Sequence, residues 1–187
     1  LSEFYAGGNK QKSQTYFYSP EQDQTYLMVI PGYRVYVSGI LEVPEREWWE
    51  KHVFGFNWTN FKDLSVQFPD NPAQNFTVVM KNRQVLIPGM ESDTTRLNEF
   101  LDHVSLLTAD SFLDPAEAGY DSLMGQNPKM EITIHDVGGN SYHFALLSPA
   151  ADSSYYVGLL QKKYLARFEF KKIRNLLRFK SFFERKG

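Results

Sequence analysis

The stretch between residues 93 and 107 constrains the fold more than any other part of this 187-residue chain. Its apolar residues recur at spacings that place them on one face of a helix: Leu97, Phe100, Leu101, Val104 and Leu107. Ser92 or Asp93 can accept a hydrogen bond from the first free backbone N–H groups, which predicts where this helix begins. A helix with one apolar face must bury it against another element, so its neighbours in sequence decide the fold class.

Alternating apolar and polar residues predict β-hairpins on both sides of this helix. Pairing residue 68 with 76, 66 with 78 and 64 with 80 would place all their apolar side chains on one face. Apolar residues also alternate over 130–134 and 142–146, around a three-residue turn at Gly138–Asn140, and this register would make His135 and His143 cross-strand neighbours. We expect further strands at 14–18, 26–30, 84–87, 154–160 and 164–170.

These patterns predict an α+β fold, with a mostly antiparallel sheet of β-hairpins packed on one long amphipathic helix. We expect a single domain, residues 1–187. A Tyr-led pattern occurs twice, once over residues 15–27 and again over 154–165, which predicts an internal partial repeat. It subdivides the chain into a partial repeat at 1–60, a hairpin-helix-hairpin unit at 61–148 and the start of a second repeat at 149–187.

The charge is unevenly distributed along the sequence. Residues 161–187 carry ten Lys and Arg against two Glu, although the formal net charge of the chain is −2. Either this segment is an amphipathic element packed against an acidic body, or it is a basic surface for anionic lipid, nucleic acid or an acidic partner. Between residues 168 and 183, eight Phe, Leu and Ile residues are interleaved with the charges, which favours the packed element; no nucleic-acid partner is expected.

The sequence holds no recognisable catalytic motif, so we expect no catalytic residue, no cofactor and no enzymatic activity. Cysteine is absent, which excludes disulfides, thiolate metal sites and cysteine nucleophiles. His135 and His143, with Glu131 as a third ligand, form the one candidate metal site, but two histidines alone are an incomplete ligand set. If these residues bound a metal ion, the protein could be a metal-dependent hydrolase. The simpler interpretation is a solvated sheet face that happens to contain two histidines.

Aromatic residues make up 16% of the chain and supply the best candidates for a binding surface. Aromatic rings bind sugars and peptides well, and the candidate residues are Trp48, Trp49, Trp58, Tyr16 and Tyr33. The alternative is that these rings form the core of an aromatic-rich sheet, because each alternates with apolar neighbours.

The order of elements, with Tyr155-Tyr156-Val157 followed by Tyr164-Leu165, resembles the bacterial family known as domain of unknown function 4340. Pro31-Gly32-Tyr33 and Trp48-Trp49-Glu50-Lys51 resemble its Bacteroidetes-type branch. Residues Val85-Leu86 depart from the family, whose members often show a Trp there. The resemblance implies a periplasmic or surface protein of the bacterial envelope, tethered as a lipoprotein or by a membrane anchor, and some relatives occur beside ABC transporter subunits involved in gliding.

Together these observations predict a non-catalytic, envelope-tethered binding or assembly module with an unidentified protein partner. The alternative is a glycan or peptide binder that acts through its aromatic surface. The chain opens with Leu1 rather than Met, which predicts that a leading segment carrying the membrane anchor has been removed.

Overall fold

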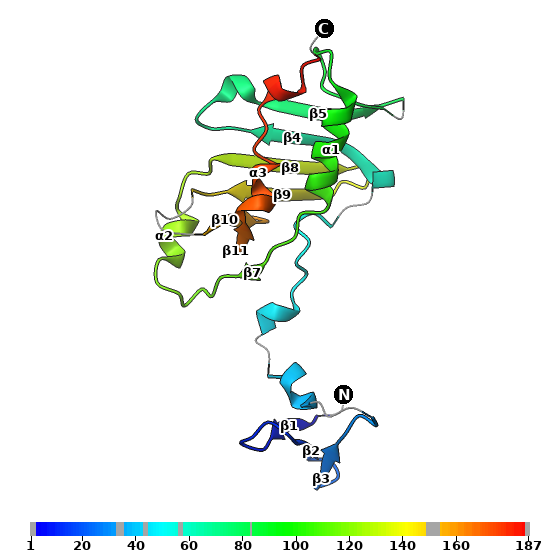
Figure 1. Cartoon of the computed structure of the whole chain (residues 1–187), viewed down its shortest axis with the longest axis vertical. Helices are drawn as coiled ribbons and strands as arrows, with labels where there is room; N and C mark the ends of the chain where they lie inside the picture. The colour runs from blue at the N-terminus through cyan, green and yellow to red at the C-terminus, as the bar shows by residue number, and fades with distance from the viewer. Residues whose placement is uncertain are drawn as a thin grey trace. The chain divides into compact units, whose positions relative to one another are not determined.

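The computed structural model describes residues 3–32, 36–42, 45–55, 58–82, 84–148 and 154–185, without the side chains of Ile40, Glu47 and Trp58 (Figure 1). The chain divides into two compact units: unit 1 from Leu1 to Trp49 and unit 2 from Glu50 to Gly187. The segments 61–148 and 149–187, which the sequence analysis separates, thus belong to the same unit. The boundary between the two units lies between residues 49 and 50, and the subdivision into repeats stays a prediction.

Unit 1 is a three-stranded antiparallel meander followed by two short 3₁₀ helices. Its elements are β1 (Tyr5–Gly8), β2 (Thr15–Ser19), β3 (Gln24–Met28), η1 (Val37–Ile40) and η2 (Glu45–Trp48). Two buried hydroxyl groups tie η1 to the sheet. The Ser38 backbone N–H donates to Thr15 Oγ1 over 2.9 Å, and Ser38 Oγ donates to the Gly7 carbonyl over 2.8 Å.

No described hydrophobic residue of unit 1 is buried. Its two buried residues are polar, Thr15 at 1% and Ser38 at 0% exposure. By contrast, eleven of the sixteen exposed large hydrophobic side chains in the described part of the chain belong to this unit. The described part of unit 1 therefore has no hydrophobic core, the main source of stability in a folded domain.

Unit 2 is built on an eight-stranded antiparallel sheet with the strand order β6-β5-β4-β8-β9-β10-β11-β7 (Figure 1). The strands are β4 (Phe61–Gln67), β5 (Phe76–Lys81), β6 (Gln84–Leu86), β7 (Ser111–Phe112), β8 (Met130–Asp136), β9 (Ser141–Leu146), β10 (Tyr155–Leu160) and β11 (Tyr164–Glu169). The helical elements are α1 (Thr94–Ser105), α2 (Tyr120–Met124), α3 (Phe170–Arg174), η3 (Trp58–Asn60), η4 (Pro72–Gln74) and η5 (Lys180–Phe183). The mixed fold with antiparallel pairing agrees with the α+β class predicted from sequence.

The main core lies between one face of this sheet and the layer formed by α1, α3 and the chain that follows (Figure 1). Asp93 caps α1 by accepting a hydrogen bond from the Arg96 backbone N–H, and Leu97, Phe100, Leu101 and Val104 of this helix are buried. Phe183 brings the C-terminal segment into the same core. Its ring lies 5.3 Å from that of Phe100 and 5.1 Å from that of Phe76 on β5, centroid to centroid.

The C-terminal segment is also held to the start of α1 by backbone pairing. Glu184 forms an isolated antiparallel bridge with Ser92, and the Asp93 N–H donates to the Phe183 carbonyl over 2.8 Å. The Arg96 guanidinium donates a hydrogen bond to the Phe182 carbonyl, which adds a charge-assisted contact between α1 and the C-terminal segment. These bonds fix the position at which Phe183 enters the core.

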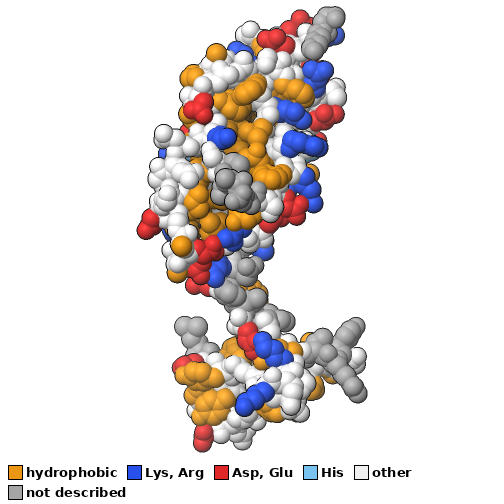
Figure 2. Space-filling view, turned by 60° about the vertical axis from the view of Figure 1, so that its left-hand side comes forward, with side chains coloured by type: hydrophobic (Ala, Val, Ile, Leu, Met, Phe, Trp, Pro, Cys, Tyr) orange, Lys and Arg blue, Asp and Glu red, His pale blue; other side chains and the backbone are white. Residues whose placement is uncertain are grey.

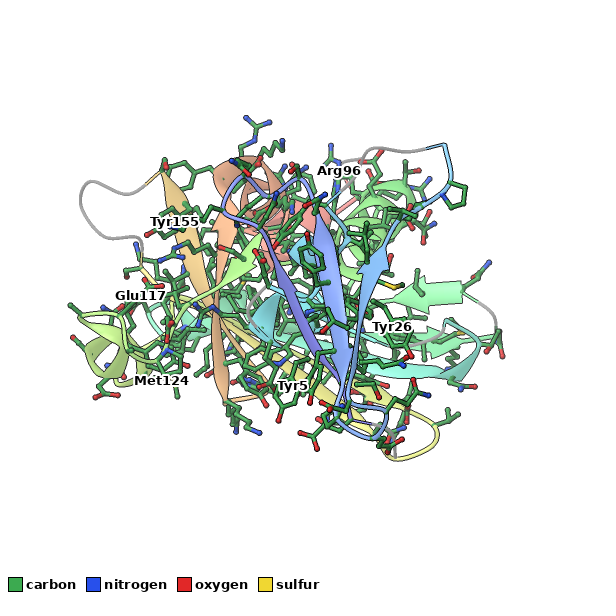
Figure 3. The ribbon with its side chains drawn as sticks, turned by 90° about the horizontal axis from the view of Figure 1, so that it is seen from below. Tyr5, Tyr26, Arg96, Glu117, Met124 and Tyr155 are labelled. Atoms are coloured by element: carbon green, nitrogen blue, oxygen red, sulfur yellow. The ribbon has the colours of Figure 1, made fainter. Side chains whose placement is uncertain are left out.

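A second, smaller cluster lies around Leu113, Leu147, Val157 and Leu165. Met124 of α2 and Tyr155 of β10 pack against it, and Figure 3 shows them on the same side of the view as Glu117. Arg167 of β11 links these parts, because its guanidinium lies 2.5 Å from a Glu117 carboxylate oxygen and 5.2 Å from the centre of the Tyr155 ring. The segment from 113 to 124 shows little sequence pattern, but these contacts with β10 and β11 pack it against the sheet.

The strand partners differ from the predicted registers, although the buried faces agree. Val66 lies opposite Phe76 rather than Val78, because the turn with η4 takes residues 68 and 75 out of the ladder: the Phe68 N–H donates to the Asn75 side chain. The two Tyr-led hairpins also differ from each other. Tyr26 lies opposite Phe17, whereas Tyr164, its counterpart in the predicted repeat, lies opposite Leu160.

Candidate functional site

The predicted pairing of His135 with His143 is wrong. His135 lies opposite Ser141, and His143 lies opposite Thr133. The three-residue turn is Val137–Gly139 rather than Gly138–Asn140, because Gly139 takes the left-handed conformation that closes such turns, with φ of 87°. The Asp136 carboxylate holds this turn by accepting from the backbone N–H and the side-chain amide of Asn140, and these bonds lower the pKa of Asp136.

Each histidine has a carboxylate of its own instead of a shared site. His135 Nδ1 lies 2.7 Å from Asp63 Oδ1 on the neighbouring strand β4, and His143 Nε2 lies 4.0 Å from Glu131 Oε1. Across the described ranges, no three His, Asp or Glu side chains lie close enough together to hold a metal ion. The geometry of the described residues therefore adds no third ligand to the two histidines.

We expect the partly buried His143 to make the stability of unit 2 depend on pH. Burial lowers its pKa, with Lys162 acting in the same direction and Glu131 opposing it, and its Nδ1 is buried without a hydrogen-bond partner among the described residues. A histidine with a lowered pKa in the folded state binds more protons when unfolded, so stability falls as pH drops through the unfolded-state pKa of about 6.5. We expect the urea concentration at the midpoint of unfolding to be lower at pH 5.5 than at pH 7.5. The decrease should be smaller in the His143→Gln variant.

The control for this measurement is His103→Gln, on the exposed side of α1. It should leave the pH dependence in place. Equal pH dependence in wild type and His143→Gln would show that burial of this imidazole carries no such penalty.

The predicted aromatic surface is only partly within the described structure. Trp48 is 59% exposed, Trp49 is half-buried and Tyr16 is 36% exposed. Tyr33 and the Trp58 side chain lie outside the described residues. The structure adds a residue that sequence reasoning missed: Tyr5 of β1 is 58% exposed and lies opposite Tyr18 on β2.

One face of the unit 1 meander is therefore rich in tyrosine. Tyr16 and Tyr18 are two residues apart on β2 and so point to the same side, with Leu27 of β3 opposite Tyr16. The Tyr5 and Tyr18 rings are 6.3 Å apart with an interplanar angle of 33°. Tyr26, labelled with Tyr5 in Figure 3, belongs to the other face and is 42% exposed. We call the first of these faces the tyrosine face; it consists of Tyr5, Tyr16, Tyr18 and Leu27.

Unit 2 carries a groove of about 520 Å³ that the sequence did not predict. It is lined by Tyr156, Phe170, Lys171, Arg174, Leu177 and Arg178, and we call it the basic groove. Figure 2 shows Lys and Arg side chains beside hydrophobic side chains on one face of this unit. Three cationic groups next to two aromatic rings suit a ligand that carries both negative charge and apolar surface.

The basic groove exists because the C-terminal segment packs by one side only. Phe168, Ile173, Leu176 and Phe183 are each 0% exposed, so the alternating basic residues are left on the outer side. This agrees with the packed amphipathic element favoured from sequence. The same packing creates the basic surface that sequence reasoning treated as the alternative, so the two readings are not exclusive.

Comparison of the chain with family models, with curated proteins and with solved structures finds no match to any of them. The resemblance drawn from the sequence stays a prediction. No described helix has the length and apolar composition needed to cross a bilayer.

Proposed function

We propose that this protein is a non-catalytic binding or assembly module of the bacterial cell envelope. The main support for this proposal is the exposure of unit 1. Among its described residues, two polar side chains are buried and no hydrophobic side chain is. A sheet that exposes most of its large apolar side chains is the kind of surface that another protein covers. The envelope location, the N-terminal tether and an association with an ABC transporter or gliding machinery rest on the sequence resemblance.

The tyrosine face is the part of unit 1 best suited to such contact. Its four side chains carry no formal charge, although the Tyr5 and Tyr18 hydroxyls donate to the carboxylates of Glu3 and Asp23 at the edge of the face. Tyrosine is enriched at protein interfaces because its ring buries apolar area while its hydroxyl keeps a hydrogen-bond partner. Tyr5 and Leu27 are both more than half exposed and would provide most of the contact area.

Site-specific photo-crosslinking in the cells that make the protein tests this function. A benzophenone amino acid in place of Leu27, on the tyrosine face, is expected to give a discrete heavier adduct. The same group in place of Leu106, which is 71% exposed on unit 2, is the control and should give none. If position 27 gives no adduct, or only the adducts of position 106, the proposal is wrong.

A glycan binder is the second candidate, and the pair Tyr5 and Tyr18 is the observation that favours it. Their ring centroids are 6.3 Å apart with an interplanar angle of 33°, so the two neighbouring rings could both contact one oligosaccharide. An oligosaccharide that blocks the crosslink at position 27 would move the assignment to this candidate.

We also infer that α1 is the amphipathic helix around which the sheet is organised, and that unit 1 is a diverged partial repeat. The buried apolar side of α1 supports the first inference. Support for the second is a shared order: β1, β2 and β3 form a meander followed by short helical elements, as do β9, β10 and β11. The different hairpin registers mean that any common origin has been followed by a shift in strand pairing.

A further inference from the structure

The cations of the basic groove are available to an external anion. Arg174 is exposed, and its guanidinium makes no ion pair or hydrogen bond with another described residue. Arg178 lies over the Phe182 ring at 4.6 Å, which orients its guanidinium without neutralising it. Lys171 contacts Glu169 over 2.6 Å, but both side chains are more than half exposed, so that pair is weak.

The apolar wall of the groove is preformed. The rings of Tyr156 and Phe170 meet edge to face with centroids 4.9 Å apart, so Tyr156 supports the ring of Phe170 from the sheet below. Phe170 is nevertheless 43% exposed, so part of its surface is open to a ligand. A rigid, already ordered wall lowers the entropy cost of binding.

A second hollow of about 220 Å³ continues the site. Leu177 lines both hollows, and Phe68, Phe179 and Lys129 line the second. Phe179 is 48% exposed and rests against Phe68 with ring centroids 4.9 Å apart. Two adjacent hollows, each with an aromatic ring and at least one cation, fit an extended ligand with alternating apolar and acidic groups.

A peptide fits this arrangement better than a membrane or a nucleic acid. A bilayer is flat, whereas the aromatic rings here line hollows that a protruding side chain can enter. A nucleic acid carries phosphates in an unbroken row. The carboxylate of Glu169, which contacts Lys171 of the groove, and that of Asp70, which lines the second hollow, would repel part of that row. A peptide can place its carboxylates only where the cations are.

We propose that the basic groove of unit 2 binds an acidic peptide segment that carries aromatic or large aliphatic side chains. Its carboxylates pair with Arg174 and Arg178, and its apolar side chains lie against Phe170 and Leu177. This site is on unit 2 and does not depend on the tyrosine face, so its test is independent of the crosslinking experiment.

The probe is a synthetic ten-residue peptide of alternating glutamate and phenylalanine, measured by fluorescence anisotropy with the full chain. We expect saturable binding that weakens about tenfold in Arg174→Glu, and weakens in Phe170→Ala. Binding should also weaken as the salt concentration rises, because the contacts are ionic and exposed. Lys81→Glu, with the same charge change at an exposed site outside both hollows, is the control and should bind like wild type.

Three outcomes would overturn the proposal. The first is no saturable binding of the peptide at millimolar concentration, and the second is equal weakening by Arg174→Glu and Lys81→Glu. The third is stronger binding to vesicles of phosphatidylserine and phosphatidylcholine, or to single-stranded DNA, than to the peptide. Circular dichroism of each variant shows whether the fold is retained, and Arg174→Gln replaces Arg174→Glu if it is not.

Discussion

Replacing Phe183 by alanine is expected to lower the free energy of unfolding of unit 2 by about 3–5 kcal/mol, the usual cost of removing a buried phenyl ring. Phe183 is fully buried and contacts the rings of Phe76, Phe100 and Phe182. Its loss leaves a cavity between β5, α1 and η5 that these rigid rings can only partly fill. Urea unfolding of the full chain, followed by far-ultraviolet circular dichroism, measures the change.

Phe179→Ala is the matched control for this experiment. It also removes a phenyl ring, four residues earlier in the chain. That ring is 48% exposed and, among the described aromatic rings, packs only on Phe68. We expect a loss of less than about 1.5 kcal/mol, because half of the apolar area is already in water. Equal losses in the two variants would mean that Phe183 does not close the core.

The second large effect is expected from the smallest possible change, Gly158→Ala on β10. A Cβ atom added to Gly158 would overlap Phe144 Cε2, far inside van der Waals contact, and would lie 2.8 Å from Phe168 Cε2. Both rings are 0% exposed and pack edge to face, so neither can move without disturbing its neighbours. Overpacking of this kind costs about 3 kcal/mol, measured by the same urea titration.

Two further variants separate the steric clash at Gly158 from the general effect of replacing a glycine by alanine. Gly55→Ala adds a Cβ in open space in the same unit and should change stability by less than about 0.5 kcal/mol. Gly158→Ala combined with Phe144→Leu should lose less than the sum of the two single changes, because the smaller side chain makes room for the methyl group. Simple additivity would contradict the proposed clash.

Much of the strand content of unit 2 was predictable because its strands alternate cleanly. In β8, Met130, Ile132 and Ile134 are buried at 0% exposure, whereas the residues between them are half-buried. This alternation survives an error in register, since a shift of two positions leaves every side chain on the same face. For that reason the core was predicted correctly while the partners of His135 and His143 were not.

Two short elements of unit 2 were not predicted, because the sequence around them shows no alternation or helical period. Strand β7 has two residues and α2 has five. The basic groove escaped prediction for another reason. Tyr156 on β10 and Arg178 beyond α3 are far apart in sequence, and only the packing of Ile173 and Leu176 brings them together.

The entry of Phe183 into the core also limits how unit 2 can be made in a cell. Its ring partners Phe76 and Phe100 are synthesised about a hundred residues earlier, and β4 must likewise wait for β8. During translation these two rings can pack on each other but lack Phe183, so unit 2 cannot complete folding until residue 183 has left the ribosome. A chaperone that shields this interval would therefore raise the yield of folded protein more than one that acts after release.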